Sequence, residues 1–266
     1  MTGAADDTTL PWVRVLLVGL LAGFTSGLFG VGGGIVIVPA LGLLVGMDHK
    51  LATGTSLSAI VPISVAGIVG YATGGELDWA AAAPIAAGAL LGAVAGTHLL
   101  VRLSAPLLQV LFAGAMVLTA LRMVVEDGDG AGRGPLTAAA VAGLVLLGLA
   151  SGILAGLLGV GGGIIIVPVL TLVFGLPHVL AKGTSLAVIL PTAVMGTLRN
   201  RRRALTALRA AAVVGAGGVV SAYAASKLSL DLDPGLSKSL FGALLVLAAV
   251  RLAREGWRGL RGPAGR

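Results

Sequence analysis

Long apolar stretches follow one another along this chain of 266 residues, separated by short polar or charged connections. Most of them approach the roughly 20 residues that a helix needs to cross a bilayer, and the strict alternation of a membrane β-barrel is absent from the sequence. The pattern predicts an all-α polytopic membrane protein, in which each helix satisfies its own backbone groups. About ten segments are predicted, five per half: 11–29, 31–46, 52–72, 79–101 and 106–125, then 136–158, 161–175, 181–198, 207–226 and 236–253.

The second half of the chain repeats the first at a constant offset of 129 residues. A repeat of this length indicates one fold built from two halves. The equivalent features are the glycine-rich runs 27–39 and 156–168, Gly54-Thr55-Ser56 and Gly183-Thr184-Ser185, His49 and His178, and Pro62 and Pro191. The predicted divisions are an N-terminal tail (1–10), repeat 1 (11–125), a linker (126–135), repeat 2 (136–254) and a basic C-terminal tail (255–266).

The second segment of each half is short for a complete span. Segments 31–46 and 161–175 open with glycines, and a proline follows five residues after the last of them. Glycine and proline both weaken a helix, so these segments are predicted to be broken or re-entrant helices. Whether they cross the bilayer completely is left open by the sequence.

The charged connections predict that the two halves have opposite orientations. Loop 73–78 contains Glu76 and Asp78 and no basic residue, whereas the equivalent stretch 199–205 contains four arginines. Arginine-rich loops stay in the cytoplasm, so the two equivalent connections are expected on opposite sides of the membrane. Five crossings per half give an inverted-topology repeat with both termini in the cytoplasm.

Composition narrows the functional classes. Hydrophobic residues make up 57% of the chain and charged residues 11%, whereas a soluble domain carries about a quarter charged residues. Cysteine is absent, the three histidines have no partner set, and no acid lies inside a predicted segment, so we expect no enzyme activity, no metal and no cofactor. The net charge of +7 comes from arginines at segment ends, and no nucleic-acid motif accompanies it.

Two glycine triplets are candidate substrate-binding elements. They are Gly32-Gly33-Gly34 and Gly161-Gly162-Gly163. A dinucleotide-binding loop would need a strand before it and an acid about twenty residues later, which the flanking apolar segments do not provide. Glycines at the start of a half-helix leave free N–H groups at the positive end of its dipole. Two such ends can hold one anion, as in inverted-repeat transporters; the alternative is that the glycines only allow close helix packing.

Four hydroxyl residues complete the candidate substrate site, namely Thr55, Ser56, Thr184 and Ser185. They either cap the N-termini of segments 52–72 and 181–198 or donate hydrogen bonds to a permeating anion. Both interpretations remain open at this point.

The equivalent His49 and His178 are candidates for a proton-sensitive gate, with interfacial polar residues as the simpler interpretation. Lys182 either attracts an anion toward the second half or extends its charge to the interface. No lysine or arginine is predicted at mid-depth in the membrane.

Small residues recur every four positions along several segments. Such stripes allow helices to approach closely in lipid. Packing within the bundle is the favoured interpretation, and a homodimer interface is the alternative. The stripes are Gly19, Gly23 and Gly27; Gly148, Gly152 and Gly156; and Gly88, Gly92 and Gly96.

The glycine runs 27–39 and 156–168, with the Thr-Ser-Leu triplets at Thr55 and Thr184, resemble the TauE/SafE sulfite-exporter family, also called the toluene-sulfonate uptake permease family. The resemblance extends from Trp12 to Arg254. It implies a multi-pass inner-membrane permease for small sulfur-containing anions such as sulfite or organosulfonates.

The resulting hypothesis is an alternating-access carrier in the lipid bilayer that exports a small anionic substrate. An anion channel with the same glycine motifs as its filter is the alternative. A third interpretation is a membrane scaffold that binds a partner through the arginine stretch 199–203.

Overall fold

The computed structural model describes residues 11–99, 134–158, 162–202 and 205–261, together with scattered positions between 110 and 132. Helices are the only regular secondary structure within these ranges. They are α1 (Trp12–Phe29), α2 (Gly34–Val45), α3 (His49–Ala72), α4 (Trp79–Leu99), α6 (Ala138–Leu158), α7 (Gly163–Leu172), α8 (His178–Arg202), α9 (Leu208–Asp231) and α10 (Pro234–Arg261).

The predicted all-helical membrane fold is confirmed at this level. Five helices, α1, α3, α8, α9 and α10, are long and apolar enough to cross a membrane. The predicted short segments are short helices, with 12 residues in α2 and 10 in α7. At 1.5 Å per residue each extends through only about half of the hydrocarbon core. Most of the predicted segment 106–125 lies outside the described residues.

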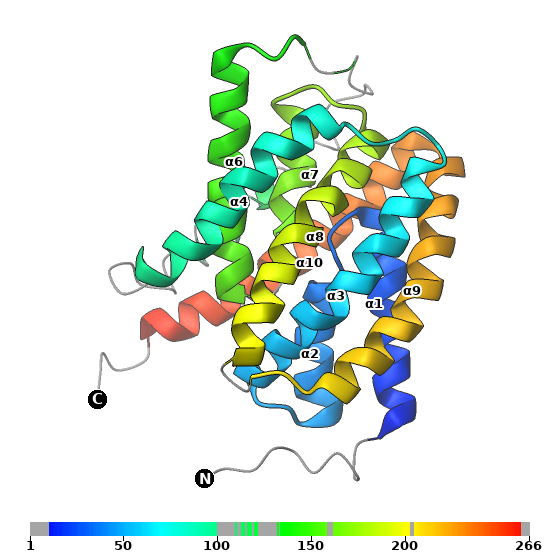
Figure 1. The fold of residues 1–266 in the computed structure, drawn as a ribbon, viewed down its shortest axis with the longest axis vertical. Helices are drawn as coiled ribbons and strands as arrows, with labels where there is room; N and C mark the ends of the chain where they lie inside the picture. The colour runs from blue at the N-terminus through cyan, green and yellow to red at the C-terminus, as the bar shows by residue number, and fades with distance from the viewer. Residues whose placement is uncertain are drawn as a thin grey trace.

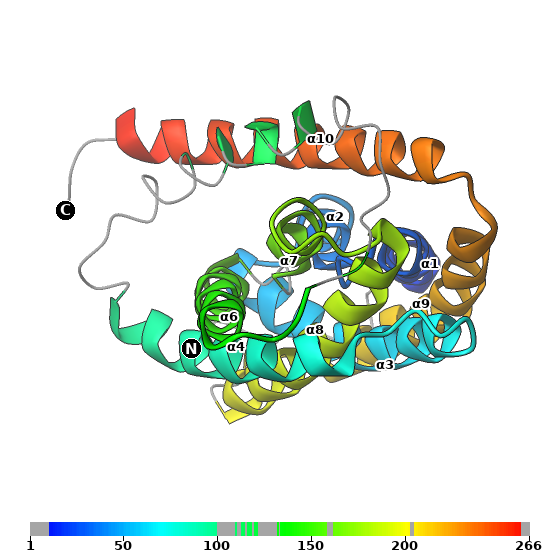
Figure 2. The same ribbon diagram turned by 90° about the horizontal axis from the view of Figure 1, so that it is seen from above.

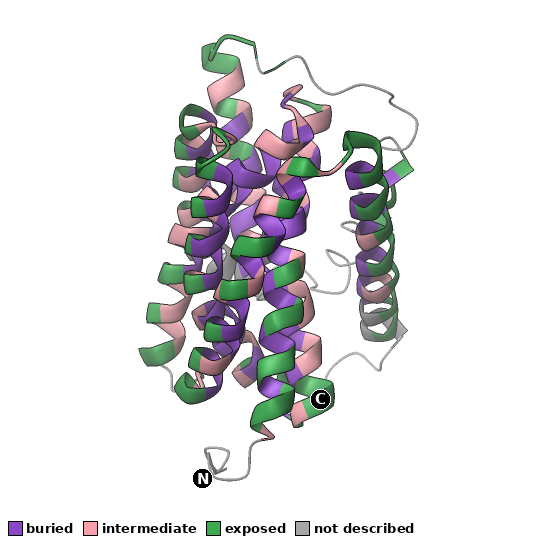
Figure 3. Cartoon of the chain, turned by 90° about the vertical axis from the view of Figure 1, so that its right-hand side faces the viewer, coloured by how far each residue is buried: buried purple, intermediate pink, exposed green. Residues whose placement is uncertain are grey.

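Large apolar side chains on the outer surface of the bundle support its placement in lipid. On α1, Leu17 and Leu21 are 51% and 58% exposed, and on α10, Leu247 is 70% exposed. Figure 3 shows exposed and buried stripes alternating around the helices, with the buried side facing the interior. A soluble monomer rarely exposes so much apolar surface, whereas a lipid-facing helix requires it.

Helices from the two halves alternate in the bundle. The first helix of one half packs on the fourth helix of the other, so α1 lies against α9 and α6 lies against α4. The two central helices, α3 and α8, contact each other, while α10 lies along one side as a separate layer (Figure 2).

Equivalent helices run in opposite directions in Figure 1. Helix α1 runs upward and α6 downward, α3 runs upward and α8 downward, and α2 and α7 diverge from the middle of the bundle toward opposite ends. The start of α1 and the end of α8 lie at the same end. The last turn of α8 carries Arg199, Arg201 and Arg202, which were predicted to lie in a loop. Arg199 donates to the Ala93 carbonyl at 3.0 Å.

The glycine stripes lie between helices of this chain. A Cβ placed on Gly23 of α1 would lie 2.2 Å from the Gly218 carbonyl oxygen of α9, and one on Gly152 of α6 would lie 2.1 Å from the Ala89 carbonyl oxygen of α4. These two contacts are equivalent under the offset of 129 residues. The stripes therefore allow backbone-to-backbone packing between the two halves.

We predict that Gly23→Ala lowers the free energy of unfolding by about 1–3 kcal/mol, because the added methyl group overpacks the contact between α1 and α9. Thermal melting of the purified protein in detergent measures the change.

Gly42→Ala in α2 is the matched control, since its Cβ would meet no atom closer than Met47 O at 3.8 Å. Replacing glycine by alanine inside a helix without a clash stabilises by about 0.5–1 kcal/mol. Equal melting temperatures for the two variants would contradict the packing described.

Candidate functional site

Each half breaks its chain at a glycine turn between a long helix and a short one. In the first half α1 ends at Phe29, and the backbone passes through Gly30, Gly32 and Gly33 with φ of 70°, 77° and 74° before α2 begins. Glycine adopts this left-handed region without the steric penalty that a side chain brings. In the second half Gly162 has φ 76° and precedes α7, while Gly161 lies outside the described residues.

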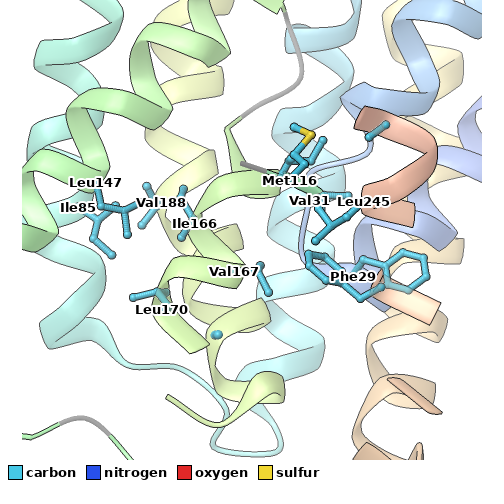
Figure 4. Close-up of a cluster of buried hydrophobic side chains, with 14 of the residues drawn as sticks. Phe29, Val31, Ile85, Met116, Leu147, Ile166, Val167, Leu170, Val188 and Leu245 are labelled. Carbon is cyan, nitrogen blue, oxygen red and sulfur yellow. The ribbon is translucent and has the colours of Figure 1, made fainter. Parts of the chain in front are cut away.

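The two glycine turns meet inside the bundle. A Cβ placed on Gly163 would lie 2.7 Å from the Gly30 carbonyl oxygen and 2.8 Å from the Val31 Cα atom. Gly32, Gly33 and Gly34 are buried, as are Gly162 and Gly163. Val31 belongs to a buried apolar cluster with Phe29 and Val167 (Figure 4). The structure therefore brings the predicted glycine elements together.

Two equivalent isoleucines surround the first turn. A Cβ on Gly32 would face Ile189 of α8 at 3.1 Å and Ile60 of α3 at 3.6 Å, and these two residues are related by the 129-residue offset. Each turn leads into a short helix whose N-cap is a glycine, Gly33 for α2 and Gly162 for α7, without a side-chain hydrogen bond. The first turns of α2 and α7 thus present backbone N–H groups without a capping side chain.

Each of the two threonines accepts the backbone N–H of the residue directly before a helix of the opposite half, and we call these two contacts the reciprocal caps. Of the two interpretations left open by the sequence, capping of its own segment does not hold for Thr55, because α3 begins at His49, where Asp48 accepts from the Lys50 N–H group, and Thr55 lies inside the helix. Thr55 Oγ1 instead accepts from the N–H of Ala207, the N-cap of α9, at 3.1 Å.

Thr184 makes the equivalent contact in the other direction. Its Oγ1 atom accepts from the N–H of Asp78, directly before α4, at 3.0 Å, and donates to the Leu180 carbonyl at 2.7 Å. Because Asp78 and Ala207 are also related by the 129-residue offset, each half holds the residue that precedes a helix of the other. Asp78 in turn caps α4, since its Oδ1 atom accepts from the N–H groups of Ala80 and Ala81.

The glycine and the serine on either side of the threonine in each Gly-Thr-Ser tripeptide also have structural roles. A Cβ on Gly54 would lie 1.8 Å from the Leu205 carbonyl oxygen, and one on Gly183 would lie 2.0 Å from that of Glu76. Only glycine admits the connecting loop so closely. Ser185 Oγ donates to the Gly30 carbonyl at 2.8 Å and braces the first glycine turn. Ser56 is also fully buried.

The two equivalent histidines have different surroundings. His49 is exposed at the start of α3, as an interfacial residue would be. His178 is 1% exposed, and its ring lies edge-on to Phe241 with 5.3 Å between centroids. No cluster of three or more metal-ligating side chains occurs in the part of the chain that the structure describes.

Lys182 had two open interpretations from the sequence, attraction of an anion or extension of its charge to the interface. It is fully buried, and its Nζ atom donates to Ser229 Oγ at 3.0 Å and to Ser237 Oγ. Its backbone lies beside the first glycine turn, 2.6 Å from a Cβ placed on Gly30. The available signal was a lysine within an apolar segment, which is more often buried in a bundle than exposed to lipid.

These features define a class of protein: a multi-pass helical membrane protein in which two broken helices meet inside the bundle. The sulfite exporter TauE/SafE family matches residues 2–123 and 144–266. The chain belongs to this family, which confirms the resemblance inferred from the glycine runs.

Curated relatives are named as transporters. A probable membrane transporter protein of Xylella fastidiosa is 28% identical over 91% of this chain and 95% of its own length. A probable membrane transporter protein of Haemophilus influenzae is 36% identical over 59% of this chain and 61% of its own length. The probable membrane transporter protein YunE of Bacillus subtilis is 27% identical over 72% of this chain and 78% of its own length. No solved structure matched the chain.

The reciprocal caps lead to a stability prediction. Thr55→Val and Thr184→Val should each lower the free energy of unfolding by about 1 kcal/mol, since each removes the acceptor for a helix N-terminus. Thermal melting in detergent measures both variants.

Thr55→Ser and Thr184→Ser retain the hydroxyl group and serve as matched controls, expected to melt close to the native protein. Serine and valine variants with the same melting temperature would show that the caps contribute nothing.

Proposed function

We propose that this protein exports a small sulfur-containing oxyanion, of the sulfite or organosulfonate class, by alternating access. The observation that carries the proposal is the contact between the two glycine turns, Gly163 against Gly30 and Val31, inside a protein of the TauE/SafE family. The family's description as sulfite exporters supports the class of substrate.

We further propose that the two halves form an inverted-topology repeat. Three observations support it: the uninterrupted sequence repeat, the opposite directions of equivalent helices (Figure 1), and the reciprocal contacts of Thr55 and Thr184. The arginines at the end of α8 support a cytoplasmic position for that end, because arginine-rich connections stay in the cytoplasm. Both termini are then cytoplasmic, and the loop with Glu76 and Asp78 faces outside.

In this arrangement the anion binds where the glycine turns meet. Helices α2 and α7 begin there and run apart (Figure 1), so the positive ends of their dipoles converge. Backbone N–H groups of Gly32–Gly34 and Gly161–Gly163 replace part of the hydration shell of the anion. The hydroxyls of Thr55, Ser56, Thr184 and Ser185 are the further proposed ligands.

Binding by the hydroxyls requires a conformational change. In the structure described here the hydroxyl protons of Thr184 and Ser185 are donated to the carbonyls of Leu180 and Gly30. These hydrogen bonds would have to exchange for bonds to the anion as one half moves against the other. Alternating access by rocking of two repeats provides such a change.

The membrane potential supports export as the direction. A potential of 100 mV, negative inside, contributes about 2.3 kcal/mol per expelled charge, equivalent to about fifty-fold in concentration. Uptake would need a coupling group, and the described carboxylates lie at helix ends or in connections. Those whose side chains the structure describes are Asp48, Glu76, Asp78, Asp231 and Asp233.

Flux of sulfite and methanesulfonate into reconstituted vesicles with an imposed potential tests the glycine site. Gly32→Ala should reduce the flux by about tenfold or more, a barrier change of about 1.4 kcal/mol, because a methyl group then lies between the turn and Ile60 and Ile189.

Gly46→Ala is the control, with φ 74° at Gly46 against 77° at Gly32 and no atom within 4 Å of its Cβ. It introduces the same backbone strain away from the turns and should retain the flux. Equal flux through both variants would contradict the glycine site. Unitary currents above the turnover of a carrier would favour the alternative, an anion channel with the glycine motifs as its filter.

A further inference from the structure

A basic cluster is buried where α8 begins, α9 ends and α10 begins. It consists of His178 and Lys182 on α8, Ser229 on α9, and Ser237 and Lys238 on α10, and we call it the Lys182 cluster. These side chains are between 0% and 8% exposed. The cluster lies at the opposite end of α8 from Arg199, Arg201 and Arg202.

Hydroxyl groups surround the ammonium group of this cluster. Lys182 donates to the Oγ atoms of Ser229 and Ser237, and Ser229 donates to the Leu28 carbonyl at 3.3 Å, near the end of α1. A serine hydroxyl can donate as well as accept, and its proton rotates to suit its partner. Ammonium and hydroxyl groups together are the donors that a small oxyanion needs.

His178 provides a second, independent observation. It lies one helical turn before Lys182 and therefore on the same face of α8. Neither ring nitrogen has a hydrogen-bond partner among the described residues, although the ring is almost completely buried. A buried polar atom without a partner destabilises the folded protein, and such a group in a native structure calls for a partner.

The repeat shows that the cluster is not part of the duplicated architecture. At the equivalent positions of the first half, Thr53 replaces Lys182, Leu108 replaces Ser237 and Leu100 replaces Ser229. His49, the counterpart of His178, is exposed. The reciprocal caps and the glycine contacts form in both halves, although the first half has no lysine cluster. The packing that the two halves share therefore does not depend on such a cluster.

We propose that the Lys182 cluster is a second anion site, which binds one small free oxyanion on the side of the membrane opposite the arginines. The Lys182 ammonium, the hydroxyls of Ser229 and Ser237 and an N–H of His178 are the donors, and Lys238 adds positive charge. The choice of sulfite and sulfonates as probes rests on the proposed function. The cluster adjoins the first glycine turn through Lys182 and Gly30, so the two sites are neighbours along one path.

Isothermal titration of the full chain in nanodiscs of zwitterionic lipid tests the site, with sulfite under nitrogen and methanesulfonate as probes and chloride as the reference anion. Lys182→Met should weaken binding of both probes by about tenfold or more, about 1.4 kcal/mol, because it removes the charged hydrogen-bond donor. Lys227→Met is the matched control, since Lys227 is a half-buried lysine of α9 that lies outside the cluster and bonds to Thr73.

His178→Phe gives a second variant that preserves the apolar packing on Phe241. It should also weaken binding, by about fivefold, or about 1 kcal/mol. Native affinity in both Lys182→Met and His178→Phe overturns the proposal, and so does the absence of binding to the native chain.

Two further arms separate the alternatives. Adding phosphatidylglycerol to the nanodiscs should leave the affinity for both probes nearly unchanged. If the lipid instead competes strongly with the probes in the native chain, and Lys182→Met abolishes that competition, the cluster binds a lipid phosphate and the proposal is overturned. Gly32→Ala should still bind both probes, so failure of the transport hypothesis and failure of this site give different results.

Discussion

One physical constraint governs the rest of this structure: a helix that breaks inside a membrane must still satisfy its backbone polar groups. This protein breaks two helices and places the breaks against each other, with Gly163 packed on Gly30 and Val31. The left-handed glycines turn the chain, and Ser185 holds the Gly30 carbonyl. The N–H groups at the starts of α2 and α7 have no capping side chain. These uncapped ends support the proposed interior site for negative charge.

The Gly-Thr-Ser tripeptides connect that site to the rest of the bundle. In the second half the glycine admits the loop before α4, the threonine accepts the Asp78 N–H directly before α4, and the serine braces the glycine turn of the other half. The glycine and threonine of the first half make the equivalent contacts with Leu205 and Ala207 before α9. Because these contacts join opposite halves, movement of one half would strain them and the turn together. Such coupling between the proposed interior site and the relative position of the halves is what the proposed carrier mechanism requires.

The sequence predicted much of this arrangement. The repeat, the short second helices that begin at glycines, and the family follow from local residue patterns. It could not predict which helix Thr55 and Thr184 cap, because the acceptor and donor are separated by more than a hundred residues. The environments of His49 and His178 differ for the same reason: Phe241 comes from α10 and covers only one of them. The burial of Lys182 was not predicted, because its serine partners on α9 and α10 approach it only in the folded chain.

The orientation of the two halves tests the central claim most directly. The chain contains no cysteine, so single cysteines can be introduced without removing any. Thr73 and Arg202 are both exposed and are related by the 129-residue offset. In intact cells a membrane-impermeant maleimide should label Thr73→Cys, and should label Arg202→Cys only after the membrane is opened. Labelling of both cysteines from the same side would contradict the inverted repeat and the meeting of its glycine turns.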